Sequence, residues 1–106
     1  MFGSSVNVRT ARDLHAGGAM LLDVRTKPEW RTGHAPGADH VSMDSVAQRL
    51  EWIARRAGDE PVLVICRSGN RSGRVAGMLR RQGVDARNVR GGMIAWQRAG
   101  FDVVTR

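Results

Sequence analysis

The sequence predicts an α/β fold of three layers, with a small, mainly parallel central sheet flanked by helices. Short apolar segments that suit buried strands alternate along the chain with segments whose apolar residues recur at helical spacing. Strands that alternate with helices imply right-handed crossovers, which leave the strands parallel within one sheet. Because 106 residues supply one hydrophobic core but not two, we expect a single domain over residues 1–106.

In the first half of the chain, glycine, proline and N-capping residues bound most of the expected elements. Thr10 is the expected N-cap of the first helix. The longest helix is expected where apolar residues follow the i, i+3, i+4, i+7 pattern from Val46 onwards. The expected strands are 6–8, 19–24 and 39–41, and the expected helices are 11–16, 27–32 and 44–56.

In the second half, the wholly apolar strand 61–65 is followed by a polar loop and by a helix over 73–82, with Ser72 as its N-cap. A last strand over 84–89 and a short helix over 93–99 follow. We expect three apolar residues after that helix to pack back onto the core: Phe101, Val103 and Val104.

Cys66, the only cysteine of the chain, stands where the strand 61–65 ends. In open α/β sheets ligands bind at the carboxyl ends of the strands. A lone cysteine after an apolar strand is more often an inert core residue. Here a loop with two arginines and a glycine follows it, so Cys66 is a candidate nucleophile.

The composition narrows the class of ligand. The net charge is +7, and 16 of the 17 basic residues are arginines spread along the chain, with only five aromatic residues among them. Nucleic-acid binding is therefore not favoured, whereas a basic surface attracts small anionic substrates. One cysteine and three scattered histidines make no metal-ligand cluster, so we expect no metal and no other cofactor. Without an apolar span or a signal peptide we expect no membrane partner and a cytoplasmic location.

Four segments in this order and spacing resemble the single-domain rhodaneses, sulfurtransferases that carry sulfur as a cysteine persulfide. The segments are Leu22–Arg25, Glu29–Ala38, the loop Cys66–Ser72, and Gly91–Met93 with Trp96. The resemblance covers nearly the whole chain and implies a parallel sheet flanked by helices. Its one mild departure is Ala35, where the family has a branched aliphatic residue. The resemblance implies that Cys66 is the catalytic nucleophile.

The loop after Cys66 should favour the thiolate, the form of cysteine that attacks sulfur. Backbone amides curled around the sulfur, the positive end of the following helix and two guanidinium groups would each lower the pKa of the thiol. The predicted substrate-binding residues are Arg67, Ser68, Gly69, Asn70, Arg71 and Ser72. Asp23 and Arg25 are predicted to support this loop through ion pairs and hydrogen bonds, with Arg25 adding positive charge.

The resemblance implies two half-reactions, in which a small anionic sulfur donor loads Cys66 and a thiol or cyanide acceptor unloads it. Forked arginine donors suit oxyanions, so thiosulfate is the predicted donor. Four residues separate Cys66 from Arg71, one fewer than in the related phosphatases and arsenate reductases, and this argues against a phosphate cradle. Two alternatives stay open: a persulfide carrier that delivers sulfur to a partner protein, and a non-catalytic interaction domain.

Other notable side chains have structural explanations. Glu29 is expected to pair with an arginine, and His34, in a Gly-Pro loop, to make structural hydrogen bonds. The three tryptophans fall at helix positions and are expected to pack in or beside the core.

Overall fold

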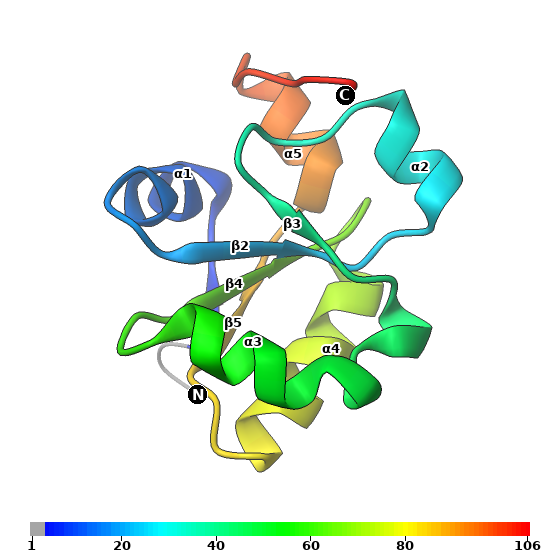
Figure 1. Ribbon diagram of the computed structural model, residues 1–106. Coiled ribbons are helices and arrows are strands. Elements are labelled where there is room, and N and C mark those ends of the chain that lie inside the picture. The colour runs from blue at the N-terminus through cyan, green and yellow to red at the C-terminus, as the bar shows by residue number, and fades with distance from the viewer. Residues whose placement is uncertain (1–3) are drawn as a thin grey trace.

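The computed structural model describes residues 4–106 and is built on a five-stranded sheet (Figure 1). Every neighbouring pair of strands is parallel, and the strand order is β1-β5-β4-β2-β3. The predicted α/β fold with a parallel central sheet is therefore confirmed. The strands are β1 (Ser5–Val6), β2 (Met20–Asp23), β3 (Asp39–His40), β4 (Val62–Ile65) and β5 (Ala86–Val89).

Helices cover both faces of the sheet. One face packs against α1 (Val8–Ala16) and α5 (Gly92–Arg98), and the other against α3 (Leu50–Ala57) and α4 (Asn70–Arg81). The short α2 (Lys27–Thr32) follows β2 and lies on the α5 side of the sheet in Figure 1. The three predicted layers are thus present, and within residues 4–106 no helix is long and apolar enough to cross a bilayer.

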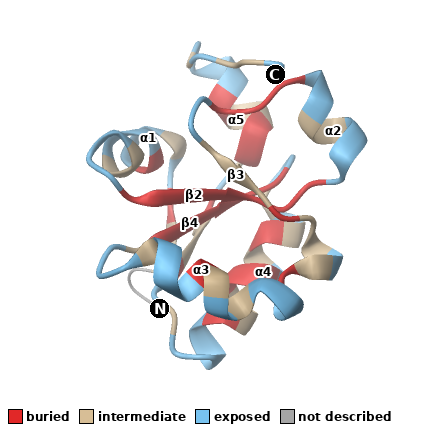
Figure 2. Cartoon of the chain, viewed as in Figure 1, coloured by how far each residue is buried: buried red, intermediate tan, exposed pale blue. Residues whose placement is uncertain are grey.

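Alternation along the two central strands divides the core in two. Both strands are buried throughout (Figure 2). In β4, Val62 and Val64 pack towards α3 and α4, whereas Leu63 and Ile65 pack towards α1 and α5. Because successive side chains of a strand point to opposite faces, Cys66 continues the row of Val62 and Val64 and faces α4.

The first helix begins earlier than predicted. Asn7, not Thr10, is the N-cap of α1, and its Oδ1 accepts a hydrogen bond of 2.8 Å from the Thr10 N–H. Val8 therefore belongs to the helix and not to a strand over 6–8. Both residue types cap helices, and the sequence alone favoured the later of the two.

The helix predicted over 44–56 is also wrong in its first half. That stretch contains two 3₁₀ turns, Met43–Ser45 and Ala47–Arg49, before α3 begins at Leu50. The Val46 side chain is nevertheless fully buried, as the amphipathic pattern predicted. Over two turns, spacings of 3.0 and 3.6 residues bury nearly the same positions, so periodicity does not separate them.

The helix α4 begins at Asn70, so Ser72 is not its N-cap, contrary to the prediction. Gly69, with φ of 109°, precedes the helix, and no side chain caps it. A left-handed φ favours glycine, and here it lets the chain turn from the loop into the helix three residues early. Ser72 lies in the first turn with its hydroxyl directed into the protein.

The C-terminal segment packs back as predicted. Phe101 and Val103 contact the core on the α1 and α5 side of the sheet. Val104 pairs in antiparallel fashion with His34, and the Trp96 Nε1–H donates to Asp102 O at 2.9 Å. This segment closes over α5, which in turn contacts the loop after β4.

Candidate active site

The sulfur of Cys66 lies at the carboxyl end of the central strand β4, where two donors point at it. The Gly69 N–H donates to Sγ at 3.1 Å, and the Ser72 Oγ lies 3.2 Å from Sγ. Cys66 itself is only 1% exposed. The sulfur is thus covered by the loop that follows Cys66 and lies beside the first turn of α4.

These contacts change the acidity of the thiol. Burial raises the pKa of Cys66, but the hydrogen bond from the Ser72 side chain, together with backbone N–H groups, lowers it more, so the pKa lies below the ordinary value. Those backbone groups belong to Ser72, Gly69 and Ser68. A lowered pKa places more of the sulfur in the thiolate form at neutral pH.

The helix α5 holds the loop from outside. The N–H groups of Met93 and Ile94 donate to the carbonyl oxygens of Cys66 and Arg67, at 2.8 and 3.0 Å. Gly92 makes this close approach feasible, because its φ is +54° and a Cβ there would overlap both of those carbonyl groups. The Gly-Gly turn before α5 therefore fixes the backbone of the loop.

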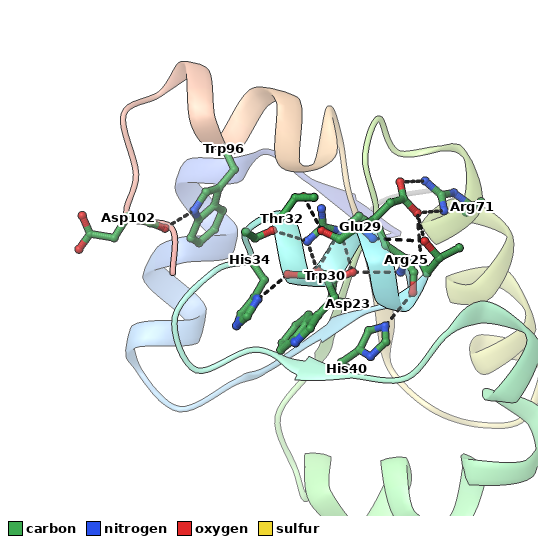
Figure 3. Close-up of polar contacts among 12 residues, drawn as sticks. Asp23, Arg25, Glu29, Trp30, Thr32, His34, His40, Arg71, Trp96 and Asp102 are labelled. Carbon is green, nitrogen blue, oxygen red and sulfur yellow. Dashed lines mark hydrogen bonds and ion pairs between the residues drawn. The ribbon is translucent and has the colours of Figure 1, made fainter. Parts of the chain in front are cut away.

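The two arginines of the loop have different environments. Arg71 makes a two-pronged ion pair with Glu29 of α2, at 2.7 and 2.9 Å (Figure 3). This pair lowers the pKa of Glu29 to about 2 and raises that of Arg71. Arg67 is exposed, and no acidic side chain of residues 4–106 pairs with it.

Arg67 borders a hollow of about 190 Å³ between the loop, α2 and α5. Its wall also includes Thr32, Met93, Ile94 and Gln97. Ser68 and Asn70 are exposed on the rim of the loop, and Gly69 is half-buried. The predicted substrate-binding residues are therefore together, but only Arg67 offers an unpaired charge.

Asp23 and Arg25 form a buried pair next to this site. The Arg25 Nε and Nη2 groups donate to both oxygens of Asp23, at 2.7 to 3.1 Å, and Nη2 also donates to Gly33 O at 2.8 Å (Figure 3). The pair joins the end of β2 to the loop after α2. The Arg25 guanidinium is engaged by these hydrogen bonds, and the supporting role of the pair for the Cys66 loop stays a prediction.

The loop after α2 is held by aromatic rings. Trp30 stacks on His34 at 3.4 Å between ring centroids and on His40 at 4.9 Å. The His34 ring also bonds Trp30 O at 2.9 Å, and the His40 ring bonds Arg25 O at 2.8 Å. His34 makes structural hydrogen bonds, as the sequence predicted. The hydrogen bond of His40 was not predicted.

Asn88 of β5 is a neighbour of the site that the sequence analysis missed. Its Nδ2 donates to Gly69 O at 3.1 Å, and its Oδ1 accepts from the Ser72 hydroxyl at 2.6 Å. The parallel pairing of β4 with β5 places it beside Val64, two residues before Cys66. The strand also contains Arg87, so a polar side chain at position 88 gave no distinct signal in the sequence.

The parallel sheet and the cysteine held by amide and hydroxyl donors at a strand end define an α/β domain with a candidate nucleophile at the edge of its sheet. A sequence profile of the rhodanese-like domain matches residues 8–99, and the chain belongs to this family. YtwF of Bacillus subtilis, named as a predicted sulfurtransferase, is 39% identical over 77 residues, which cover 73% of this chain and 72% of that protein.

Two solved structures resemble most of the chain. The rhodanese-related protein of Thermoplasma volcanium superposes with a TM-score of 0.86 at 25% identity, covering 96% of this chain and 98% of that one. A rhodanese-like domain protein of Staphylococcus aureus gives a TM-score of 0.78 at 30% identity, covering 88% and 90%. Together with the family match, these relatives support sulfurtransferase activity in broad terms.

Proposed function

We propose that this protein moves a sulfane sulfur from thiosulfate, or a similar donor, to a thiophilic acceptor through a persulfide on Cys66. The observation that carries the proposal is the pair of donors on Sγ, the Gly69 N–H at 3.1 Å and the Ser72 hydroxyl at 3.2 Å. Both stabilise the thiolate, which is the attacking form. Membership of the rhodanese-like family supports the same class of reaction.

The chemistry divides into two half-reactions. The Cys66 thiolate attacks the outer sulfur of thiosulfate, so that a new S–S bond forms on Sγ, the donor's S–S bond breaks, and sulfite leaves with the electron pair. Cyanide or a thiol then attacks the terminal sulfur, and Cys66 leaves as thiolate. Since the chain has no second cysteine, the terminal sulfur passes to an external acceptor.

Arg67 is the proposed donor-binding cation. It is exposed and unpaired beside a hollow of about 190 Å³, which has room for a small oxyanion. The charge of Arg71 is paired with Glu29, so we assign Arg71 no direct contact with the donor. The amides of Ser68 and Gly69 would hold the persulfide between the two half-reactions.

The test is incubation with thiosulfate followed by the mass of the intact protein. We expect a gain of one sulfur atom that is lost on adding cyanide and is absent in Cys66→Ser. Arg67→Gln should raise the KM for thiosulfate several-fold, whereas the matched exposed arginine variant Arg81→Gln should not. Absence of the sulfur adduct in the wild type would refute the proposal.

A persulfide carrier that delivers sulfur to a partner protein is the second candidate. The exposed rim of the loop, with Arg67, Ser68 and Asn70, favours it because a partner's thiol can approach there. Slow transfer to cyanide and small thiols, combined with rapid transfer to a protein thiol, would assign the carrier role. Rapid turnover with small acceptors would assign the enzyme.

A further inference from the structure

The orientation of the Asn88 amide is fixed by its neighbours. Its Nδ2 lies 3.1 Å from Gly69 O, and a backbone carbonyl can only accept, so the NH₂ group faces Gly69. The carbonyl Oδ1 must then face the Ser72 hydroxyl, 2.6 Å away. This contact is shorter than the 3.2 Å between Ser72 Oγ and Cys66 Sγ.

The Ser72 hydroxyl has two acceptors and one proton. When Cys66 is a thiol, its S–H can donate to Ser72 Oγ while the hydroxyl donates to Asn88 Oδ1, and every group is satisfied. When Cys66 is a thiolate, Sγ and Oδ1 can only accept. They then compete for the same hydroxyl proton, and one of the two is left without it.

We propose that Asn88 is a positioning residue that holds the Ser72 hydroxyl proton whenever Sγ is neutral and releases it to Sγ when Sγ is anionic. The inference rests on the proposed function, because the charge on Sγ alternates during sulfur transfer. Before the donor is attacked, Sγ bears the charge and the hydroxyl points to it. In the persulfide the charge lies on the outer sulfur, and the hydroxyl returns to Asn88. Between the thiolate and the persulfide the hydroxyl proton stays on Ser72 Oγ, and only the acceptor of its hydrogen bond changes.

The competition for the hydroxyl proton determines in which direction Asn88 shifts the pKa of Cys66. Because its Oδ1 competes with the thiolate, replacing the amide by an apolar side chain of similar size should make the thiolate easier to form. A residue that merely supports the loop should act the other way, since losing the bond to Gly69 O would loosen the Gly69 N–H that stabilises the sulfur. The two roles thus predict opposite shifts.

The measurement is the pH profile of Cys66 alkylation in the full chain, with no sulfur donor present. Asn88→Leu should lower the pKa of Cys66 by up to about one unit, which is up to about tenfold more thiolate well below the pKa. In a Ser72→Ala background the same substitution should not lower the pKa of Cys66, because no hydroxyl proton is left to compete for. The charged groups around Cys66 stay the same in these variants: Arg67 in the loop, Arg71 of α4 with Glu29 of α2, and Asp23 at the end of β2.

An unchanged or raised pKa in Asn88→Leu, or an equal fall in the Ser72→Ala background, would overturn the inference. If Asn88→Leu does not unfold cooperatively, Asn88→Asp replaces it. The carboxylate of Asn88→Asp is a stronger acceptor than the amide, so it should raise the pKa of Cys66 more when Ser72 is present than in Ser72→Ala. An equal rise in the two backgrounds would refute the competition. Failure of thiosulfate to load Cys66 concerns only the proposed function, because alkylation reports the thiolate without any donor.

Discussion

Replacing Gly92 by alanine should damage the site through the backbone of the loop, while every side chain near the sulfur stays the same. The new Cβ would overlap Cys66 O and would lie 2.5 Å from Arg67 O, and the residue has φ of +54°. Overpacking of this kind costs roughly 1–3 kcal/mol. The left-handed backbone adds roughly 1–2 kcal/mol for a residue with a Cβ. We expect a loss of about 3 kcal/mol in the free energy of unfolding.

The assay is urea denaturation, with Cys66 alkylation at neutral pH as a second readout. The control is Gly100→Ala, at a glycine with φ of +77° and nothing within 4 Å of the added Cβ. It carries only the backbone cost, roughly 1–2 kcal/mol, and should leave alkylation unchanged. Gly92→Ala should also slow alkylation, because moving the loop weakens the hydrogen bonds to the sulfur. Equal stability losses in the two variants would refute this account of how α5 holds the loop.

Three further substitutions test other supports of the fold. Asp23→Asn breaks a fully buried ion pair and should cost about 3–5 kcal/mol in urea denaturation, whereas Asp85→Asn, in an exposed pair, should cost less than about 1 kcal/mol. Glu29 has a pKa of about 2 against an ordinary 4.5, so its ion pair stabilises the fold above pH 4.5. The stability gap between wild type and Glu29→Gln should therefore shrink as pH falls from 4.5 towards 2, and a constant gap would contradict that origin. Trp96→Phe removes the hydrogen bond to Asp102 O and should cost about 1 kcal/mol by thermal denaturation.

The features predictable from the sequence are those set by short-range patterns. The wholly apolar run 61–65 identified a buried central strand, and the polar residues after it identified a loop at its carboxyl end. Because successive side chains of a strand point to opposite faces, Cys66 lies on the face of the sheet that α4 covers. Fold class and the location of the sulfur therefore follow from neighbours along the chain.

Contacts between distant segments could not be predicted in the same way. The partner of Glu29 is Arg71, 42 residues later, and any of 16 arginines was eligible on sequence alone. Asn88 reaches the site only because β5 pairs with β4 in the observed register. Ser72 suits a helix N-cap by residue type, but Gly69 begins the helix earlier and leaves its hydroxyl for the sulfur.

Backbone oxygens of the loop point away from the sulfur, and this affects how the thiolate responds to salt. The carbonyls of Cys66 and Arg67 bond to α5, and that of Gly69 bonds to Gly73 and Asn88, so their negative ends are occupied away from the sulfur. The sulfur is therefore stabilised by fixed dipoles in a covered position, where mobile ions screen little. Arg67, the proposed donor-binding cation, lies on the exposed rim, where a Debye length of about 8 Å at physiological ionic strength applies. Raising the salt concentration should slow capture of an anionic donor while leaving the thiolate nearly as stable as before.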